Sequence, residues 1–136
     1  MEKILVGFDG SEWAKKALEE AIKIAQKFGS QITVLSVVPK VCFLEIGVDC
    51  ATVEGIFRAE VEGNLRRAQE IINEKEVKGE TVILEGNPAD VIVDYATNYD
   101  LIVMGSKGKD ATERTLFGSV TQKVAANATK SVLIVR

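Results

Sequence analysis

Short apolar runs rich in branched residues alternate along the chain with stretches of helical periodicity. The first run, residues 3–8, is apolar at consecutive positions, which indicates a strand buried on both faces. The expected strands cover residues 3–8, 31–38, 80–84, 101–104 and 131–135. Buried strands of this kind predict a parallel sheet with helices on both sides.

Helical signals fill the segments between these strands. Ser11 is a good N-cap, apolar residues recur on one helical face up to Phe28, and Gly29 stands where a C-terminal cap belongs. Asn87 and Pro88 are typical of an N-cap and a first helical residue. The expected helices cover residues 11–28, about 51–78, 87–97 and 119–128, and residues 39–50 are expected to form a loop.

This alternation of strands and helices predicts a doubly wound α/β fold. The expected architecture is a five-stranded parallel, Rossmann-like sheet with strand order 3-2-1-4-5. In that order strands one and four are neighbours, so the loops after Phe8 and Met104 face each other at the carboxyl edge of the sheet. Open α/β sheets bind their ligands at this point.

Length and charge narrow the class of protein. The sequence has 136 residues, 17 basic and 20 acidic side chains and a formal net charge of -3. An acidic balance argues against general binding to nucleic acids or anionic membranes. No apolar run approaches the roughly 18 residues of a membrane span, and the apolar stretch before Asp9 is too short for a signal peptide. We therefore expect one cytoplasmic domain over residues 1–136.

The sequence contains no histidine. Catalytic dyads and triads that depend on histidine are therefore excluded, as is metal ligation by imidazole. Cys42 and Cys50 stand eight residues apart and match neither a zinc knuckle nor a C-x-x-C redox motif. They are expected to be ordinary thiols, and the sequence predicts no metal site built from side chains.

Positive charge is concentrated near the C-terminus. Residues 105–136 carry six basic and two acidic side chains, whereas residues 1–104 carry a net charge of -7. Lys107, Lys109 and Arg114 belong to the loop that follows the fourth strand. A local charge of this sign can mark the place where an anion binds.

The same loop carries the most informative chemistry of the chain. Gly105 and Gly108 follow the fourth strand, and Gly118 precedes the last helix. Glycines allow a backbone to approach a ligand closely. Ser119 and Val120 would present free N–H groups at the helix N-terminus, where the helix dipole also favours an anion. These features predict phosphate binding.

Two common phosphate-binding loops do not fit this sequence. A Walker A loop needs G-x-x-x-x-G-K-[ST], but Gly108-Lys109 is followed by Asp110 and preceded five residues earlier by Val103. The dinucleotide fingerprint G-x-G-x-x-G should follow the first strand, and the residues from Gly7 to Gly10 do not supply it.

The spacing of the glycines instead resembles the ATP-binding signature of the nucleotide-binding universal stress proteins. The signature is Gly105-x2-Gly108-x9-Gly118-Ser119. The resemblance covers the whole chain and includes four further segments: Ile4–Ser11, Val37–Pro39, Asn87-Pro88 and Ser131–Val135. It implies a fold like that of the adenine-nucleotide α-hydrolases.

The resemblance also implies a set of ligands and contacts. ATP is the implied ligand, with Mg²⁺ or Mn²⁺ bridging its phosphates. The implied contacts are Asp9 to the ribose, the backbone of Val37 to adenine, Met104 and Gly105 to the nucleoside, and Gly108, Gly118, Ser119 and Val120 to the phosphates. A homodimer is implied through antiparallel pairing of the final strand, Val132–Val135.

Three positions depart from the family pattern and bear on phosphate number and affinity. Gly7 stands where relatives often have proline, Lys107 stands where arginine or histidine is common, and the insert of residues 109–117 is more polar than usual. Local alternatives also stay open at this point. Asp9 could simply cap the first helix, the loop lysines could be solvated, and Trp13 is expected to pack rather than to stack on a base.

The leading hypothesis is an ATP-binding universal stress protein that acts as a nucleotide-dependent regulatory module in the stress response, with at most slow ATPase activity. The first alternative is a nucleotide-free dimerisation module, which the intact glycine signature argues against. The second is an enzyme of the adenine-nucleotide α-hydrolase type. Such enzymes need H-x-G-H or S-G-G-x-D-S, and the residues from Phe8 to Ser11 lack the paired glycines.

Overall fold

The strands of the computed structural model form one parallel sheet, and residues 1–40, 50–112 and 114–136 are described. In this part of the chain the strand order is β3-β2-β1-β4-β5, which confirms the predicted α/β fold and its strand order. The strands are β1 (Lys3–Gly7), β2 (Gln31–Val38), β3 (Gly79–Glu85), β4 (Leu101–Gly105) and β5 (Ser131–Val135). The helices are α1 (Glu12–Phe28), α2 (Cys50–Glu74), α3 (Pro88–Tyr95), the short 3₁₀ helix η2 (Ala96–Asn98) and α4 (Ser119–Asn127).

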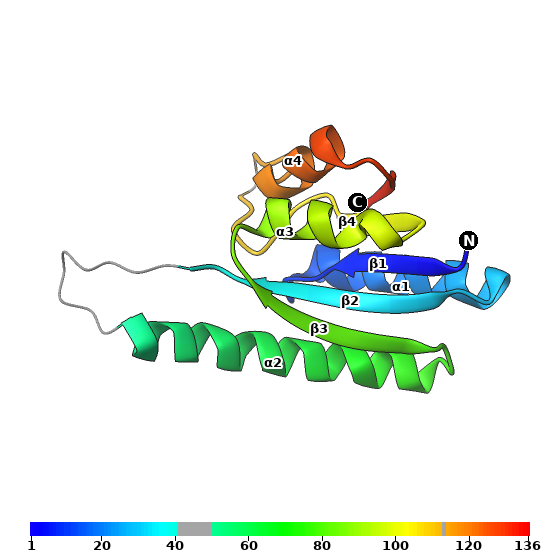
Figure 1. The fold of residues 1–136 in the computed structure, drawn as a ribbon, viewed down its shortest axis with the longest axis horizontal. Coiled ribbons are helices and arrows are strands. Elements are labelled where there is room, and N and C mark those ends of the chain that lie inside the picture. The colour runs from blue at the N-terminus through cyan, green and yellow to red at the C-terminus, as the bar shows by residue number, and fades with distance from the viewer. Residues whose placement is uncertain (41–49, 113) are drawn as a thin grey trace.

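The helices form one layer on each face of the sheet. Figure 1 shows α2 along β3, and α3 and α4 on the opposite side of the sheet. The core under α1 and α2 includes Ala17, Leu18, Leu65, Ala68 and Ile72. The core under α3 and α4 includes Leu5, Leu35, Ile92, Met104 and Val124. The strands β1, β2 and β4 are buried on both faces, as their unbroken apolar runs predicted. The outer strands β3 and β5 are only partly buried.

The end of α2 differs from its predicted position. Apolar spacing predicted a helix up to residue 78, but α2 ends at Glu74. Glu76 has a φ of 55°, and a left-handed residue of this kind ends a helix. The N–H groups of Glu76 and Val77 donate backward to Asn73 and Ile72. The chain therefore turns earlier than expected, and β3 begins directly at Gly79.

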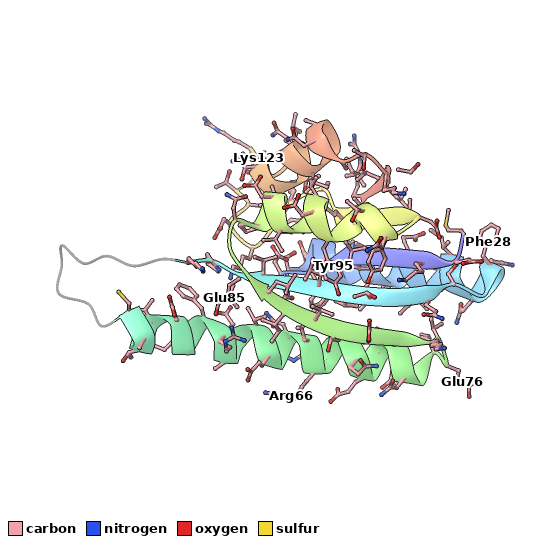
Figure 2. The ribbon with its side chains drawn as sticks, in the orientation of Figure 1. Phe28, Arg66, Glu76, Glu85, Tyr95 and Lys123 are labelled. Carbon is pink, nitrogen blue, oxygen red and sulfur yellow. The ribbon has the colours of Figure 1, made fainter. Side chains whose placement is uncertain are left out.

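The start of α2 corrects a second prediction. Cys50 is the first residue of this helix and is disulfide-bonded, so its prediction as an ordinary thiol is wrong. Cys42 lies outside the described residues. The outer side of α2 is polar, and Figure 2 shows Arg66 pointing away from the sheet. In the described residues, no helix has the length and apolar character needed to cross a membrane.

The first helix is held at both ends by its own sequence. The Ser11 side chain accepts a hydrogen bond from the Ala14 N–H. Gly29 closes the helix with a φ of 68°, and its N–H donates to the Ala25 carbonyl. Both caps agree with the prediction. Because only four residues separate Gly7 at the end of β1 from Glu12 at the start of α1, the loop that connects them is short.

Candidate functional site

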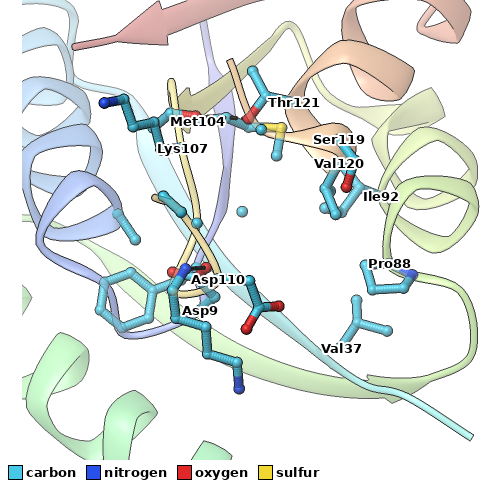
Figure 3. Close-up of a pocket in the computed structure, with 18 of the residues that line it drawn as sticks. Asp9, Val37, Pro88, Ile92, Met104, Lys107, Asp110, Ser119, Val120 and Thr121 are labelled. Atoms are coloured by element: carbon cyan, nitrogen blue, oxygen red, sulfur yellow. Dashed lines mark hydrogen bonds between the residues drawn. The ribbon is translucent and has the colours of Figure 1, made fainter. Parts of the chain in front are cut away.

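A cavity of about 640 Å³ opens at the carboxyl edge of the sheet, where β1 and β4 are neighbours. Its volume falls within the roughly 300–1,000 Å³ of small-molecule sites. In Figure 3, Ser119 and Val120 lie across an open space from Asp9, and Val37 and Pro88 close a further side. The structure brings together all eight residues that the sequence predicted for the site: Asp9, Val37, Met104, Gly105, Gly108, Gly118, Ser119 and Val120.

Asp9 joins the two loops that face each other across the switch point of the sheet. One carboxylate oxygen accepts the Ser11 N–H at 2.9 Å. The other accepts the Lys109 N–H at 2.9 Å, which fixes the start of the loop after β4. Ser11, not Asp9, caps α1. The carboxylate is thus free of a capping role and stands partly exposed in the cavity wall.

Two glycines of the signature allow the protein to pack closely against itself. A Cβ on Gly105 would lie 2.7 Å from the Trp13 carbonyl carbon, so α1 can cross the end of β4 only at a glycine. A Cβ on Gly108 would lie 2.7 Å from the Asp9 carboxylate. A Cβ on Gly118 would lie 3.4 Å from the Gly108 nitrogen, which is an ordinary contact. Gly105 and Gly108 therefore serve the packing of the loop itself, whereas Gly118 is not required for it.

The N-terminus of α4 opens into the same cavity. Gly118 is its N-cap and supplies no side-chain hydrogen bond, and Ser119 is the first helical residue. Within the described residues, the N–H groups of Ser119, Val120 and Thr121 have no acceptor. Open N–H groups combine here with the positive end of the helix dipole. This end of the cavity is chemically suited to an anion such as phosphate.

The other end of the cavity presents backbone groups of β2. The Phe8 N–H donates to the Leu35 carbonyl, and the Gly86 N–H donates to the Val38 carbonyl. Successive residues of a strand direct their backbone groups to opposite neighbours, so Val37 faces the side of β1. However, β1 ends at Gly7, which pairs with Leu35. The N–H and C=O of Val37 therefore face the cavity, where they can donate to and accept from a ligand.

The basic side chains of the loop contribute unequally. The Lys107 ammonium lies 5.4 Å from the centre of the Trp13 ring, and Figure 3 shows it directed away from the open space. Lys109 lines the cavity, whereas Arg114 is exposed and does not. Trp13 is not among the described residues that line the cavity. The local positive charge is therefore only partly a property of the cavity.

The structure adds lining residues that the sequence analysis missed. Val61 and Asn64 come from α2, Ile92 from α3 and Asp110 from the loop after β4. Pro88 also lines the cavity, and the sequence analysis used it only as a helix start. Spacing within α2 identified its core face, but no sequence motif indicated that this helix reaches the loop after β1.

The acidic residues do not form a metal site by themselves. No group of three histidine, cysteine or carboxylate side chains able to hold a metal occurs in the described parts of the chain. Asp9 and Asp110 both line the cavity. Mg²⁺ typically combines one or two carboxylates with phosphate oxygens and water. The two carboxylates are therefore chemically compatible with a cation that arrives with a phosphorylated ligand.

The fold and the cavity together define an open, doubly wound α/β protein whose cavity joins an open helix N-terminus to exposed strand backbone. A sequence model of the Universal stress protein family matches residues 1–136, and the chain belongs to this family. Universal stress protein MJ0531 of Methanocaldococcus jannaschii is 34% identical over 139 residues, which cover 99% of this chain and 82% of that protein.

Solved structures agree with this assignment. Universal stress protein UspA from Lactobacillus plantarum has a TM-score of 0.89 and 29% sequence identity, covering 99% of this chain and 97% of that chain. The universal stress protein from Archaeoglobus fulgidus in complex with dAMP has a TM-score of 0.77 and 26% identity. That similarity covers 100% of this chain and 98% of the A. fulgidus chain.

Proposed function

We propose that this universal stress protein binds ATP in the cavity and acts as a nucleotide-dependent regulatory module in the stress response. The observation that carries the proposal is that two separate sets of backbone groups face the same cavity. The N–H groups at the start of α4 suit phosphate, and the N–H and C=O of Val37 suit the edge of a base. A dAMP complex of the A. fulgidus relative supports the adenine nucleotide class.

In this proposal each part of the nucleotide has its own partners. Gly108, Gly118, Ser119 and Val120 hold the phosphates, where open N–H groups provide hydrogen bonds without the cost of reorganising side chains. The remaining contacts are Asp9 to the ribose, Met104 and Gly105 to the nucleoside, and the Val37 backbone to adenine. Mg²⁺ or Mn²⁺, when bound, would neutralise phosphate charge, with Asp9 and Asp110 as the nearby carboxylates.

Hydrolysis of the bound nucleotide is expected to be slow or to need a partner. The sequence has no histidine, and the carboxylates lining the cavity are Asp9 and Asp110. Asp9 is held by two backbone N–H groups, which orient it toward the loops rather than leave it free to activate water. Rapid turnover of ATP by the purified protein alone would contradict this part of the proposal.

The first experiment asks what the protein retains during purification. Mass spectrometry of small molecules released from unheated protein should detect an adenine nucleotide. ATP is then titrated calorimetrically against the parent and against Gly118→Val, in which the new side chain would occupy the gap between α4 and the Gly108 loop. Gly55→Val is the matched control, because no atom outside its own turns of α2 lies within 4 Å of the Cβ position of Gly55.

The expected result is ATP binding by the parent and by Gly55→Val and its loss in Gly118→Val, with circular dichroism unchanged. A parent protein that neither retains nor binds any adenine nucleotide would favour the nucleotide-free dimerisation module. Equal ATP binding by all three proteins would show that the phosphates do not lie at the start of α4.

The proposal also includes the assembly and location of the protein. Residues 1–136 act as one cytoplasmic domain, and two copies pair through Val132–Val135. β5 is an edge strand, and Leu133 on it is 36% exposed. An unpaired apolar edge is normally covered. Sedimentation velocity at micromolar concentration should show a dimer that Leu133→Lys dissociates, and a parent monomer would contradict the pairing.

A further inference from the structure

Asn64 of α2 lies directly against the loop after β1. A Cβ on Gly10 would be 2.5 Å from the Asn64 side-chain nitrogen and 2.8 Å from its oxygen. The amide therefore lies directly over the Gly10 Cα and would have to move if a Cβ were present. Gly10 also has a φ of 83°, a conformation that favours glycine for a second reason. This contact places a polar group of α2 next to Asp9.

The Asn64 amide is available to a ligand. Asn64 lines the cavity and is half-buried. Its side chain forms no hydrogen bond with any of the described residues. A side-chain amide can donate two hydrogen bonds and accept others. Because this amide faces the cavity, its donors and its acceptor can bond to a molecule bound there.

Asn64 complements the chemistry of Asp9. The Asp9 carboxylate can only accept hydrogen bonds, and each of its oxygens already accepts one backbone N–H. Sugar hydroxyls both donate and accept. Asp9 can accept hydrogen bonds from the ribose hydroxyls, but the hydroxyl oxygens then need a donor of their own. The Asn64 amide is a donor from α2 at the loop that carries Asp9.

We propose that Asn64 is a specificity-determining residue that selects ribose over 2′-deoxyribose by donating a hydrogen bond to the 2′-hydroxyl. This inference rests on the proposed function, since it assumes an adenine nucleotide in the cavity with its ribose near Asp9. It gives α2 a part in ligand selection, whereas the glycine signature involves only the loop after β4 and α4.

The test compares ATP with 2′-dATP on three proteins by calorimetric titration. The proteins are the parent, Asn64→Ala and the control Asn73→Ala, which removes an exposed asparagine farther along the same helix. The parent and Asn73→Ala should prefer ATP by roughly 3- to 10-fold, the effect of one hydrogen bond. In Asn64→Ala the preference should fall to about one, because ATP binding weakens and 2′-dATP binding does not.

The other outcomes separate the inference from the proposed function. If Asn64→Ala weakens both nucleotides equally, Asn64 contacts the base or the phosphates and the inference is wrong. If the variant keeps the parent's preference, Asn64 has no part in sugar recognition. If the parent binds both nucleotides without preference, only the inference fails. If the parent binds neither, the proposed function fails with it. Thermal unfolding of Asn64→Ala, expected to match that of the parent, excludes a folding defect as the cause.

Discussion

The backbone groups at the two ends of the strands are satisfied in opposite ways. We call these ends of the sheet its amino edge and its carboxyl edge. At the amino edge, the N–H groups of Glu2 and Lys3 both donate to the Asp100 carboxylate. The Ser30 hydroxyl donates to the Met1 carbonyl, and the Gln31 N–H donates to the Glu2 carbonyl. At the carboxyl edge, the first N–H groups of α4 and the backbone of Val37 face a cavity. One edge is closed by the protein, and the other is left open.

Chain direction explains this difference. After β1 the chain turns to α1 on one face of the sheet, and after β4 it turns to α4 on the other face. Two neighbouring strands that send their chains to opposite faces leave a crevice between them. At the amino edge the chain only enters the strands, through short turns such as that between α1 and β2. The open edge is therefore where the topology leaves backbone groups for a ligand.

The largest expected effect on stability comes from adding a side-chain atom at the close contact between α1 and β4. Gly105→Ala would place a Cβ 2.7–2.8 Å from three backbone and Cβ atoms of Trp13. Because most of these atoms are backbone, they cannot move as a flexible side chain would. We expect a loss of roughly 1–3 kcal/mol in the free energy of unfolding, the usual cost of overpacking. Urea denaturation measures this change.

The control for this prediction is Gly55→Ala in α2, where the new methyl group meets open space. Alanine is the better helix former, so this variant should be more stable than the parent by about 0.5–1 kcal/mol. If Gly105→Ala were as stable as the parent, the close approach of Trp13 to β4 would not be a constraint on the fold.

An intermediate effect is expected from Asp9→Asn. The single oxygen of the amide can still accept the Ser11 N–H, but the amide nitrogen then faces the Lys109 N–H, and two donors cannot form a hydrogen bond. The loop after β4 loses its tie to β1, which costs roughly 1 kcal/mol of stability. Amide hydrogen exchange should become faster at Lys109 while Ser11 stays protected. Unchanged exchange at Lys109 would mean that Asp9 does not hold the two edges of the cavity together.

The smallest effect is expected at the closed edge. The N–H groups of Lys3 and Glu2 donate to the Asp100 carboxylate and lower its pKa. A carboxylate with a lowered pKa in the folded protein stabilises it above the ordinary pKa of about 4, and this contribution is lost as the pH falls through the folded value. Asp100→Ala should therefore be slightly less stable than the parent at pH 7, and the difference should disappear in acid.

Chemical denaturation at several pH values between 7 and 2 measures this difference. ATP binding at pH 7 should be the same in Asp100→Ala and in the parent, because Asp100 lies at the amino edge of the sheet, away from the cavity. A loss of ATP affinity would show that the two edges are coupled and would contradict the conclusion that the amino edge has no part in ligand binding.

Local sequence signals predicted most of the elements because their causes are local. Branched apolar runs gave the strands, and Ser11 and Gly29 marked the ends of α1 correctly. The end of α2 was wrong because the helix stops at the left-handed Glu76, and glutamate carries no signal for that conformation. The thiol assignment failed at Cys50 because a disulfide depends on the position of another sulfur.

The sequence by itself predicted the strands and their order, which follow from apolar periodicity and helix caps. The family was predicted through the resemblance of the glycine spacing to a known signature, and that resemblance also implied the backbone contact of Val37. Only the tertiary structure decided which side chains complete the cavity. Asn64 reaches Gly10 across 54 positions of sequence, and Lys107 turns to Trp13 instead of the cavity. Contacts between distant segments depend on how the helices pack on the sheet, and no local pattern along one chain records that packing.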